Sequence, residues 1–301
     1  MPQVKANGLS FEVESYGRET DPTILLVMGY SAQLTRWPMS MCDGLVSRGF
    51  RVVRFDNRDV GLSEKLESLG RFNAMEAFAK VASGQPLVGP YLLKDMAADA
   101  AGILDAMKIR RAHVVGASMG GMITQMMALN HADKLLSMTS IMSSTGRPGL
   151  PAGTPEAMAV LTTPPANLER DTRIAHATKV WRTIGSEAPY AATDAELRAQ
   201  AEQDIDRTPY YPDGMARQLV AILASGPRHE LLKAVKTPTL VIHGVADPLV
   251  NVAAGKDTAA CIPSARLRLI EHMGHDVPPK LVPVLVREIA DFASEIDAKA
   301  A

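Results

Sequence analysis

The sequence predicts an α/β fold with a mostly parallel central sheet, and three observations support this class. Short apolar runs rich in Val, Ile and Leu alternate with segments whose apolar residues recur at helical spacing. Such alternation is typical of parallel strands that are covered by helices on both faces. A glycine-rich turn at residues 116–121 joins one apolar run to a helix. The alternation also stops near Thr145 and resumes near residue 229.

The individual elements follow from two periodicities. Residues 9–17 alternate polar and apolar side chains and residues 23–29 form a continuous apolar run, and both patterns favour strands. In residues 91–109 the apolar side chains recur every three or four positions, which favours a helix. We expect strands at residues 9–17, 23–29, 49–56, 112–118, 135–144, 237–244 and 265–272, and helices at 91–109, 119–131, 251–262 and 279–296.

Residues 145–228 differ in character from the rest of the chain. Their first part is rich in proline and glycine, and from about residue 169 the sequence is polar, helical in spacing and dotted with aromatic residues. Strand patterns stand on both sides of this segment. We therefore expect it to be a helical cap (lid) inserted into one core domain, which comprises residues 1–144 and 229–301.

The composition describes an ordinary globular protein. The chain has 301 residues, of which 47% are hydrophobic and 22% charged, with a net charge of −1. Near-zero charge argues against nucleic-acid or anionic-membrane partners. Two cysteines, no leader-like N-terminal pattern and no long apolar run lead us to expect a cytoplasmic protein. The expected partner is a small-molecule substrate, and a homodimer is left open.

The turn at residues 116–120, Gly-Ala-Ser-Met-Gly, fits the pattern G-x-S-x-G. It follows a predicted strand and precedes a predicted helix, which is the context in which this pattern exposes a serine nucleophile. The alternative is a tight glycine turn with an incidental serine. The flanking elements favour the first interpretation, so Ser118 is the candidate nucleophile.

A serine nucleophile needs a base, usually a histidine held by a carboxylate. His275 lies in a loop between the last predicted strand and the last helix, and Asp247 follows another strand and a glycine turn. The chain order serine, aspartate, histidine is the one expected for this kind of site. His272 is a rival base. A metal site formed by His272, His275 and Asp276 is disfavoured because no further cluster supports it, so we expect no metal.

Asp56 and Asp59 are competing acids, but they precede the serine and fit that order poorly. We interpret Asp56, Arg58 and Ser63 as a hydrogen-bond network that fixes a loop near the site.

Acyl transfer also requires donors for the developing oxyanion. The expected donors are the backbone N–H groups of Met119, which follows the nucleophile, and of Tyr30, which follows Gly29 in the loop after the second strand. The candidate pocket residues are Gly29 and four aromatic side chains, which could equally pack the cap onto the core: Trp37, Trp181, Tyr190 and Tyr210.

Five segments together resemble the α/β-hydrolase superfamily: LLVMGYSAQLTRWP, RVVRFDNRDVGLS, HVVGASMGG, TPTLVIHGVADPLV and MGHDVP. Within it, the chain is most similar to aclacinomycin methylesterase-like carboxylesterases. The resemblance implies a triad of Ser118, Asp247 and His275, oxyanion donors at Tyr30 and Met119, no cofactor and a helical cap. Met28 departs from the usual His-Gly pattern, so a hydrogen bond that steadies the oxyanion loop is missing.

From these residues we expect a hydrolase that cleaves carboxylic esters through an acyl-enzyme intermediate. The alternatives are a lactone (enol-lactone) hydrolase, a C–C bond hydrolase or an acyltransferase that uses the same triad. A non-catalytic ligand-binding protein of the same fold is also open. Dehalogenases and epoxide hydrolases are disfavoured because they carry aspartate where Ser118 stands.

Overall fold

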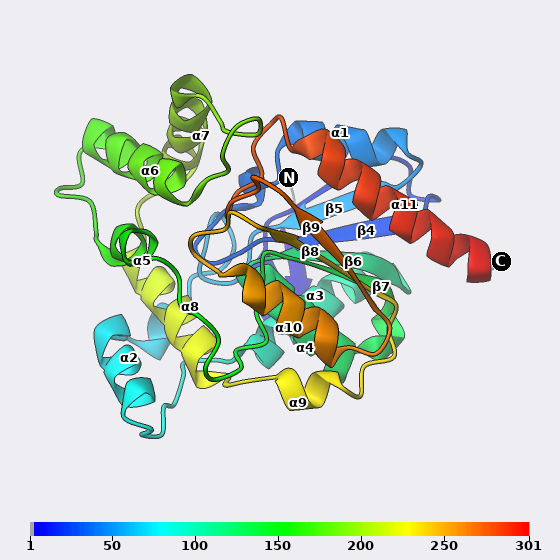
Figure 1. The fold of residues 1–301 in the computed structure, drawn as a ribbon, viewed down its shortest axis with the longest axis horizontal. Helices are drawn as coiled ribbons and strands as arrows, with labels where there is room; N and C mark the ends of the chain where they lie inside the picture. The colour runs from blue at the N-terminus through cyan, green and yellow to red at the C-terminus, as the bar shows by residue number, and fades with distance from the viewer. Residues whose placement is uncertain (1–2, 301) are drawn as a thin grey trace.

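A seven-stranded sheet forms the centre of the computed structural model, which describes residues 3–300 (Figure 1). Residues 1–2 and 301, at the ends of the expected core ranges, lie outside the described residues. The strand order is β3-β5-β4-β6-β7-β8-β9. The strands are β3 (Val13–Tyr16), β4 (Thr23–Val27), β5 (Arg51–Phe55), β6 (Ala112–Ala117), β7 (Leu135–Ile141), β8 (Thr239–Gly244) and β9 (Ala265–Ile270). Only β3 pairs antiparallel within this sheet, so the predicted α/β class is confirmed.

The first predicted strand is two strands in the structure. Residues 9–17 divide into β2 (Leu9–Phe11), which forms a hairpin with β1 (Val4–Ala6), and β3 in the main sheet. The hairpin turns at Asn7-Gly8, and both residues have positive φ, as a tight two-residue hairpin requires. Between the strands, the N–H of Glu12 donates to the Ser63 hydroxyl, so the ladder is interrupted there.

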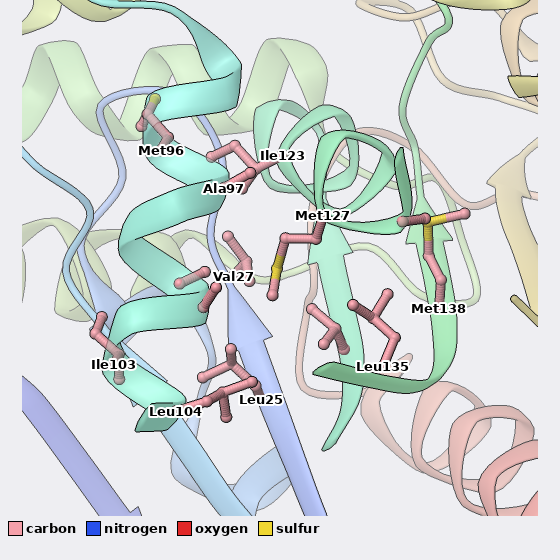
Figure 2. Close-up of a cluster of buried hydrophobic side chains, with 14 of the residues drawn as sticks. Leu25, Val27, Met96, Ala97, Ile103, Leu104, Ile123, Met127, Leu135 and Met138 are labelled. Atoms are coloured by element: carbon pink, nitrogen blue, oxygen red, sulfur yellow. The ribbon is translucent and has the colours of Figure 1, made fainter. Parts of the chain in front are cut away.

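Helices cover both faces of the sheet because its central strands are apolar on both sides. In β4, Leu25 and Val27 face one hydrophobic cluster, whereas Ile24 and Leu26 face the other. Figure 2 shows the first cluster, in which side chains of α3 and α4, such as Met127, pack on β4. The core helices are α1 (Met39–Ser47), α3 (Leu93–Ala106), α4 (Met119–Asn130), α9 (His229–Leu232), α10 (Val252–Cys261) and α11 (Val282–Ala300), with short 3-10 turns η1 (Leu34–Arg36), η2 (Glu67–Leu69) and η3 (Ala132–Lys134).

Four helices lie in the chain between β7 and β8, within residues 145–228, here called the helical insertion. They are α5 (Pro155–Thr162), α6 (Arg170–Ile184), α7 (Asp194–Arg207) and α8 (Pro212–Ala224). In Figure 1 they stand to the left of the sheet, with α2 (Ala74–Ala82), which no sequence pattern predicted, beside α8. None of the helices in residues 3–300 is long and apolar enough to cross a bilayer.

Buried ion pairs attach the helical insertion to the core. Arg217 of α8 donates to both carboxylate oxygens of Asp59, at 2.9 and 2.7 Å, and the Tyr91 hydroxyl adds a third bond to this carboxylate at 2.9 Å. From α7, Arg207 pairs with Asp56 at 2.7 Å. Both aspartates lie in the loop after β5, so this loop holds two helices of the insertion.

We predict that Arg217→Met lowers the free energy of unfolding by about 3–5 kcal/mol, because it leaves the Asp59 carboxylate buried without its partner. Urea unfolding measures this. Arg170→Met is the matched control: its pair with Asp206 is half exposed and screened by solvent, so its loss should change the free energy of unfolding far less. Equal costs for the two variants would contradict a dominant role for the buried pair.

Candidate active site

Ser118 stands at a sharp turn between β6 and α4, with φ 55° and ψ −119°. The glycines around it are required by close backbone contacts. A β-carbon at Gly120 would lie 2.0 Å from the carbonyl oxygen of Val27, and one at Gly116 would lie 2.2 Å from that of Gly120. Since no side chain fits at either position, the turn stays tight and the Ser118 side chain is presented at the carboxyl end of the sheet.

Three side chains predicted from chain order are brought together at this turn. The Nε2 atom of His275 lies 3.0 Å from Ser118 Oγ, and its Nδ1 atom lies 2.8 Å from Asp247 Oδ2. The other carboxylate oxygen of Asp247 accepts the N–H groups of Leu249 and Val250 at 2.9 and 2.8 Å. Asp247 and His275 are buried, whereas Ser118 is partly exposed and accessible to a ligand.

This geometry determines what the imidazole can do. A carboxylate can only accept at Asp247 Oδ2, so Nδ1 of His275 carries the hydrogen and Nε2 keeps a lone pair toward Ser118. Nε2 can therefore accept the proton of the Ser118 hydroxyl. The backbone N–H of His275 donates to Ile184 O at 2.7 Å, which fixes the loop from the side of the insertion.

The rival residues point elsewhere. His272 is exposed, and its Nδ1 lies 3.5 Å from Glu187 rather than near the serine. Asp276 faces Ser186. No group of three or more His, Cys, Asp or Glu side chains suited to a metal ion is found within residues 3–300.

The loop after β4 lies against the nucleophile turn. A β-carbon at Gly29 would be 3.1 Å from both Ala117 O and Ser118 Cβ, so the Gly29–Tyr30 peptide begins at this contact. Without a histidine at position 28, other polar groups fix the loop. Asn57 Nδ2 donates to the Met28 carbonyl at 2.8 Å, and the Ser31 N–H donates to Gln218 Oε1 at 2.8 Å.

The four aromatic residues that we expected to line the pocket have different surroundings in the structure. Trp37 has no exposed surface and belongs to the core cluster between β4 and α11, so its assignment to the pocket was wrong. Trp181 is half-buried and stacks on the Arg36 guanidinium at 4.1 Å. Tyr190 packs at the margin of the same core cluster. Tyr210 is also half-buried.

Tyr30 and Tyr210 are neighbours. Burial raises the pKa of Tyr30 to about 12, and the nearby Tyr210 phenol adds to the effect. A neutral Tyr30 phenol therefore stands next to Tyr210, at the loop that carries the expected oxyanion donor.

The predicted loop-fixing network is correct in part. Asp56 accepts the N–H groups of Leu34 and Leu62 at 2.7 and 2.8 Å, and the Ser63 hydroxyl donates to the Asp56 carbonyl at 2.6 Å. Arg58 takes no part in it. Its guanidinium instead forms two 2.6 Å bonds with Asp99 of α3. The sequence could not reveal this partner, since 41 residues separate the two.

Sequence reasoning considered Asp276 only as a metal ligand and missed its role as a buried carboxylate beside the base. Asp276 Oδ1 accepts the N–H and hydroxyl of Ser186 at 2.9 and 2.6 Å, and the Gly274 N–H donates to that hydroxyl at 2.9 Å. This cluster joins the loop of His275 to the end of α6. Burial raises the pKa of Asp276 to about 6, although both bonds to Ser186 oppose the effect.

We predict that Asp276→Asn stabilises the protein more at pH 8 than at pH 5. The folded-state pKa of Asp276 lies above the unfolded value, so the wild type loses stability as pH rises through about 6, whereas the variant does not. The difference in unfolding free energy between the two proteins should therefore change by about 1–2 kcal/mol between these pH values. Urea unfolding at each pH measures it, and a constant difference would contradict the raised pKa.

Comparisons with known proteins agree with this fold. The family model for the alpha/beta hydrolase fold matches residues 22–279. Rhodomycin D methylesterase DnrP of Streptomyces peucetius is 28% identical over 284 residues, which cover 88% of each chain. This similarity confirms the predicted resemblance to methylesterases of this type.

Solved structures show the same fold at lower identity. The meta-cleavage product hydrolase CumD of Pseudomonas fluorescens IP01 superposes with a TM-score of 0.76 at 20% identity, with 98% of each chain covered. An enol-lactonase of Burkholderia xenovorans LB400 gives 0.73 at 24% identity, with 97% of this chain and 100% of that chain covered. With the family match over most of its length, this chain belongs to the α/β-hydrolase fold family.

Proposed function

We propose that this protein hydrolyses carboxylic esters of small molecules through a covalent acyl-enzyme intermediate. The observation that carries the proposal is the hydrogen-bonded series Ser118 Oγ, His275 Nε2, His275 Nδ1 and Asp247 Oδ2, with separations of 3.0 and 2.8 Å. A nucleophile, a base and an orienting acid in this arrangement support acyl transfer.

In the first half-reaction, Ser118 Oγ attacks the ester carbonyl carbon while His275 Nε2 takes its proton. Asp247 stabilises the imidazolium that forms and keeps the ring in place. When the tetrahedral intermediate collapses, the imidazolium gives its proton to the leaving alcohol, and the acyl group remains on Ser118. In the second half-reaction, His275 takes a proton from water, the hydroxide attacks the acyl carbon, and the acid leaves as Ser118 regains its proton.

The oxyanion of each tetrahedral intermediate would be bound by two backbone donors, the N–H groups of Tyr30 and Met119. Two features support this assignment. Gly29 contacts the nucleophile turn, so the next peptide group starts beside Ser118. Met119 is the first residue of α4, where the N–H groups have no partner within the helix and the helix dipole favours negative charge.

We further propose that residues 145–228 act as a cap domain over a core of residues 1–144 and 229–301. Helices α5–α8 within this segment interrupt the alternation of strands and helices. The methylesterase name of DnrP supports an ester with a small alcohol as the substrate class. We expect the half-buried Trp181, Tyr190 and Tyr210 to line the pocket, which would favour an apolar or aromatic acyl part.

We predict that Ser118→Ala lowers kcat for p-nitrophenyl ester hydrolysis by roughly 10⁴-fold or more, because the nucleophile is removed. A fluorophosphonate probe should label the wild type and leave this variant unlabelled. Thermal unfolding should be little changed, since the side chain is partly exposed at the turn. Ser47→Ala, at an exposed serine of α1, is the control and should keep full activity and labelling. Labelled Ser118→Ala would place the nucleophile elsewhere.

We predict that open-chain esters are hydrolysed with a higher kcat/KM than lactones of similar size. A panel of p-nitrophenyl esters of increasing acyl length, run beside a lactone panel, measures this preference. Faster lactone opening would assign the same triad to a lactonase. A wild-type protein that hydrolyses neither panel and is not labelled by the probe would contradict the proposed function.

A further inference from the structure

We propose that Gln218, on helix α8 of the helical insertion, is a positioning residue for the oxyanion hole. This inference rests on the proposed function and deepens it. It assigns to the insertion a direct role in acyl transfer, because one of its side chains holds the loop whose backbone N–H would bind the oxyanion.

Gln218 is completely buried, and its amide connects two loops of the core. Its Oε1 atom accepts the N–H of Ser31 at 2.8 Å, and its Nε2 atom donates to the carbonyl of Arg58 at 2.8 Å. Ser31 directly follows Tyr30, so the bond is made one residue from the expected oxyanion donor. A buried amide with both ends bonded holds its partners in one geometry.

The conformation of the loop shows why it needs such a partner. The Ala32 N–H donates to the Gly29 carbonyl at 3.4 Å, so Tyr30 and Ser31 are the central residues of a turn. Ser31 has φ 53°, a left-handed conformation that non-glycine residues rarely adopt unless their surroundings enforce it. The bond to Gln218 fixes the peptide group between Tyr30 and Ser31, and with it the direction of the neighbouring Tyr30 N–H.

The other contacts make Gln218 the link from α8 to this turn, whereas Asp204 and Arg207 of α7 bond the same loop further on, at Gln33. Asn57 fixes the loop one residue before Gly29 through the Met28 carbonyl, but it belongs to the core. The residue before Gln218, Arg217, is fixed by its buried pair with Asp59. The position of Gln218 is therefore set by docking of α8, and the turn at Tyr30 and Ser31 is set by Gln218. The oxyanion donor is in place only when α8 is docked.

The test is Gln218→Met, which keeps the length of the side chain and removes both hydrogen bonds. A displaced donor weakens binding of the transition state more than binding of the ground-state ester. We expect kcat to fall by roughly ten- to a hundredfold with KM changed less than about threefold. Affinity for a trifluoromethyl ketone, which forms a tetrahedral adduct with serine, should fall in parallel with kcat.

Ser225→Ala is the matched control. Ser225 caps the same helix and accepts the N–H of Leu93, so its loss removes one bond between α8 and the core away from the oxyanion loop. It should leave kcat and ketone affinity within about threefold of wild type. Gln218→Glu keeps the acceptor for Ser31 and loses only the donor to Arg58. It should retain clearly more ketone affinity than Gln218→Met. If the methionine variant does not fold, Gln218→Leu, which also lacks both hydrogen bonds, takes its place in every comparison.

The possible outcomes separate this inference from the proposed function. A wild type that reacts with the fluorophosphonate, together with a folded Gln218→Met of unchanged kcat and ketone affinity, overturns the role of Gln218 only. Loss of ketone affinity in Gln218→Glu as large as in Gln218→Met, or in Ser225→Ala as large as in Gln218→Met, also overturns it. A wild type that neither reacts with the probe nor hydrolyses esters overturns both proposals.

Discussion

The close approach of two backbone segments is the constraint on which the site depends. The turn into α4 passes so near the end of β4 that no β-carbon fits between Gly120 and the Val27 carbonyl. This contact forces Ser118 into a positive-φ conformation and lifts its side chain from the sheet edge. Gly29, just beyond β4, touches the same turn. The serine and the loop with the expected oxyanion donor are therefore fixed relative to each other. The remaining requirement is that the fold positions His275 beside the serine.

That unit could be predicted from the sequence because its signal is local. A strand pattern, glycines at fixed offsets from Ser118 and a helix pattern stand next to one another in the chain. Asp247 and His275 were predictable for a different reason. Each follows a strand, and the carboxyl ends of parallel strands meet at one edge of the sheet, so chain order favoured one acid and left His272 as the rival of His275. Their distances to each other and to the serine come only from the structure.

The parts that sequence reasoning missed are those whose meaning depends on distant partners. An arginine next to two aspartates suggests a local network, but Arg58 bonds to Asp99 on a helix of the core. An aromatic residue after a glycine loop fits a pocket wall and a core equally well, and Trp37 belongs to the buried cluster that includes side chains of α1 and α11. Gln218 lies in an amphipathic helix with no motif around it, where a glutamine is expected on the solvent-exposed face. The role of Gln218 depends on its burial, and burial can be seen only in the folded structure.

Three contacts that sequence reasoning missed link the helical insertion to loops of the candidate site. The Ile184 carbonyl accepts the N–H of His275, Ser186 binds Asp276 beside it, and Gln218 binds Ser31. If the insertion only covered a pocket, the loops beneath it would find all their hydrogen-bond partners within the core. Here, withdrawing the insertion would leave buried N–H groups and a buried carboxylate without partners, which is costly. Rigid-body opening of the whole insertion would therefore break the bonds that hold the loops of the candidate site. Helix α5 is also tied to these loops, since the N–H of its N-cap residue, Thr154, donates to the carbonyl of Pro248, next to Asp247, at 2.7 Å. Changes in substrate preference are therefore easier to accommodate on the outer face of α6, which makes none of these bonds.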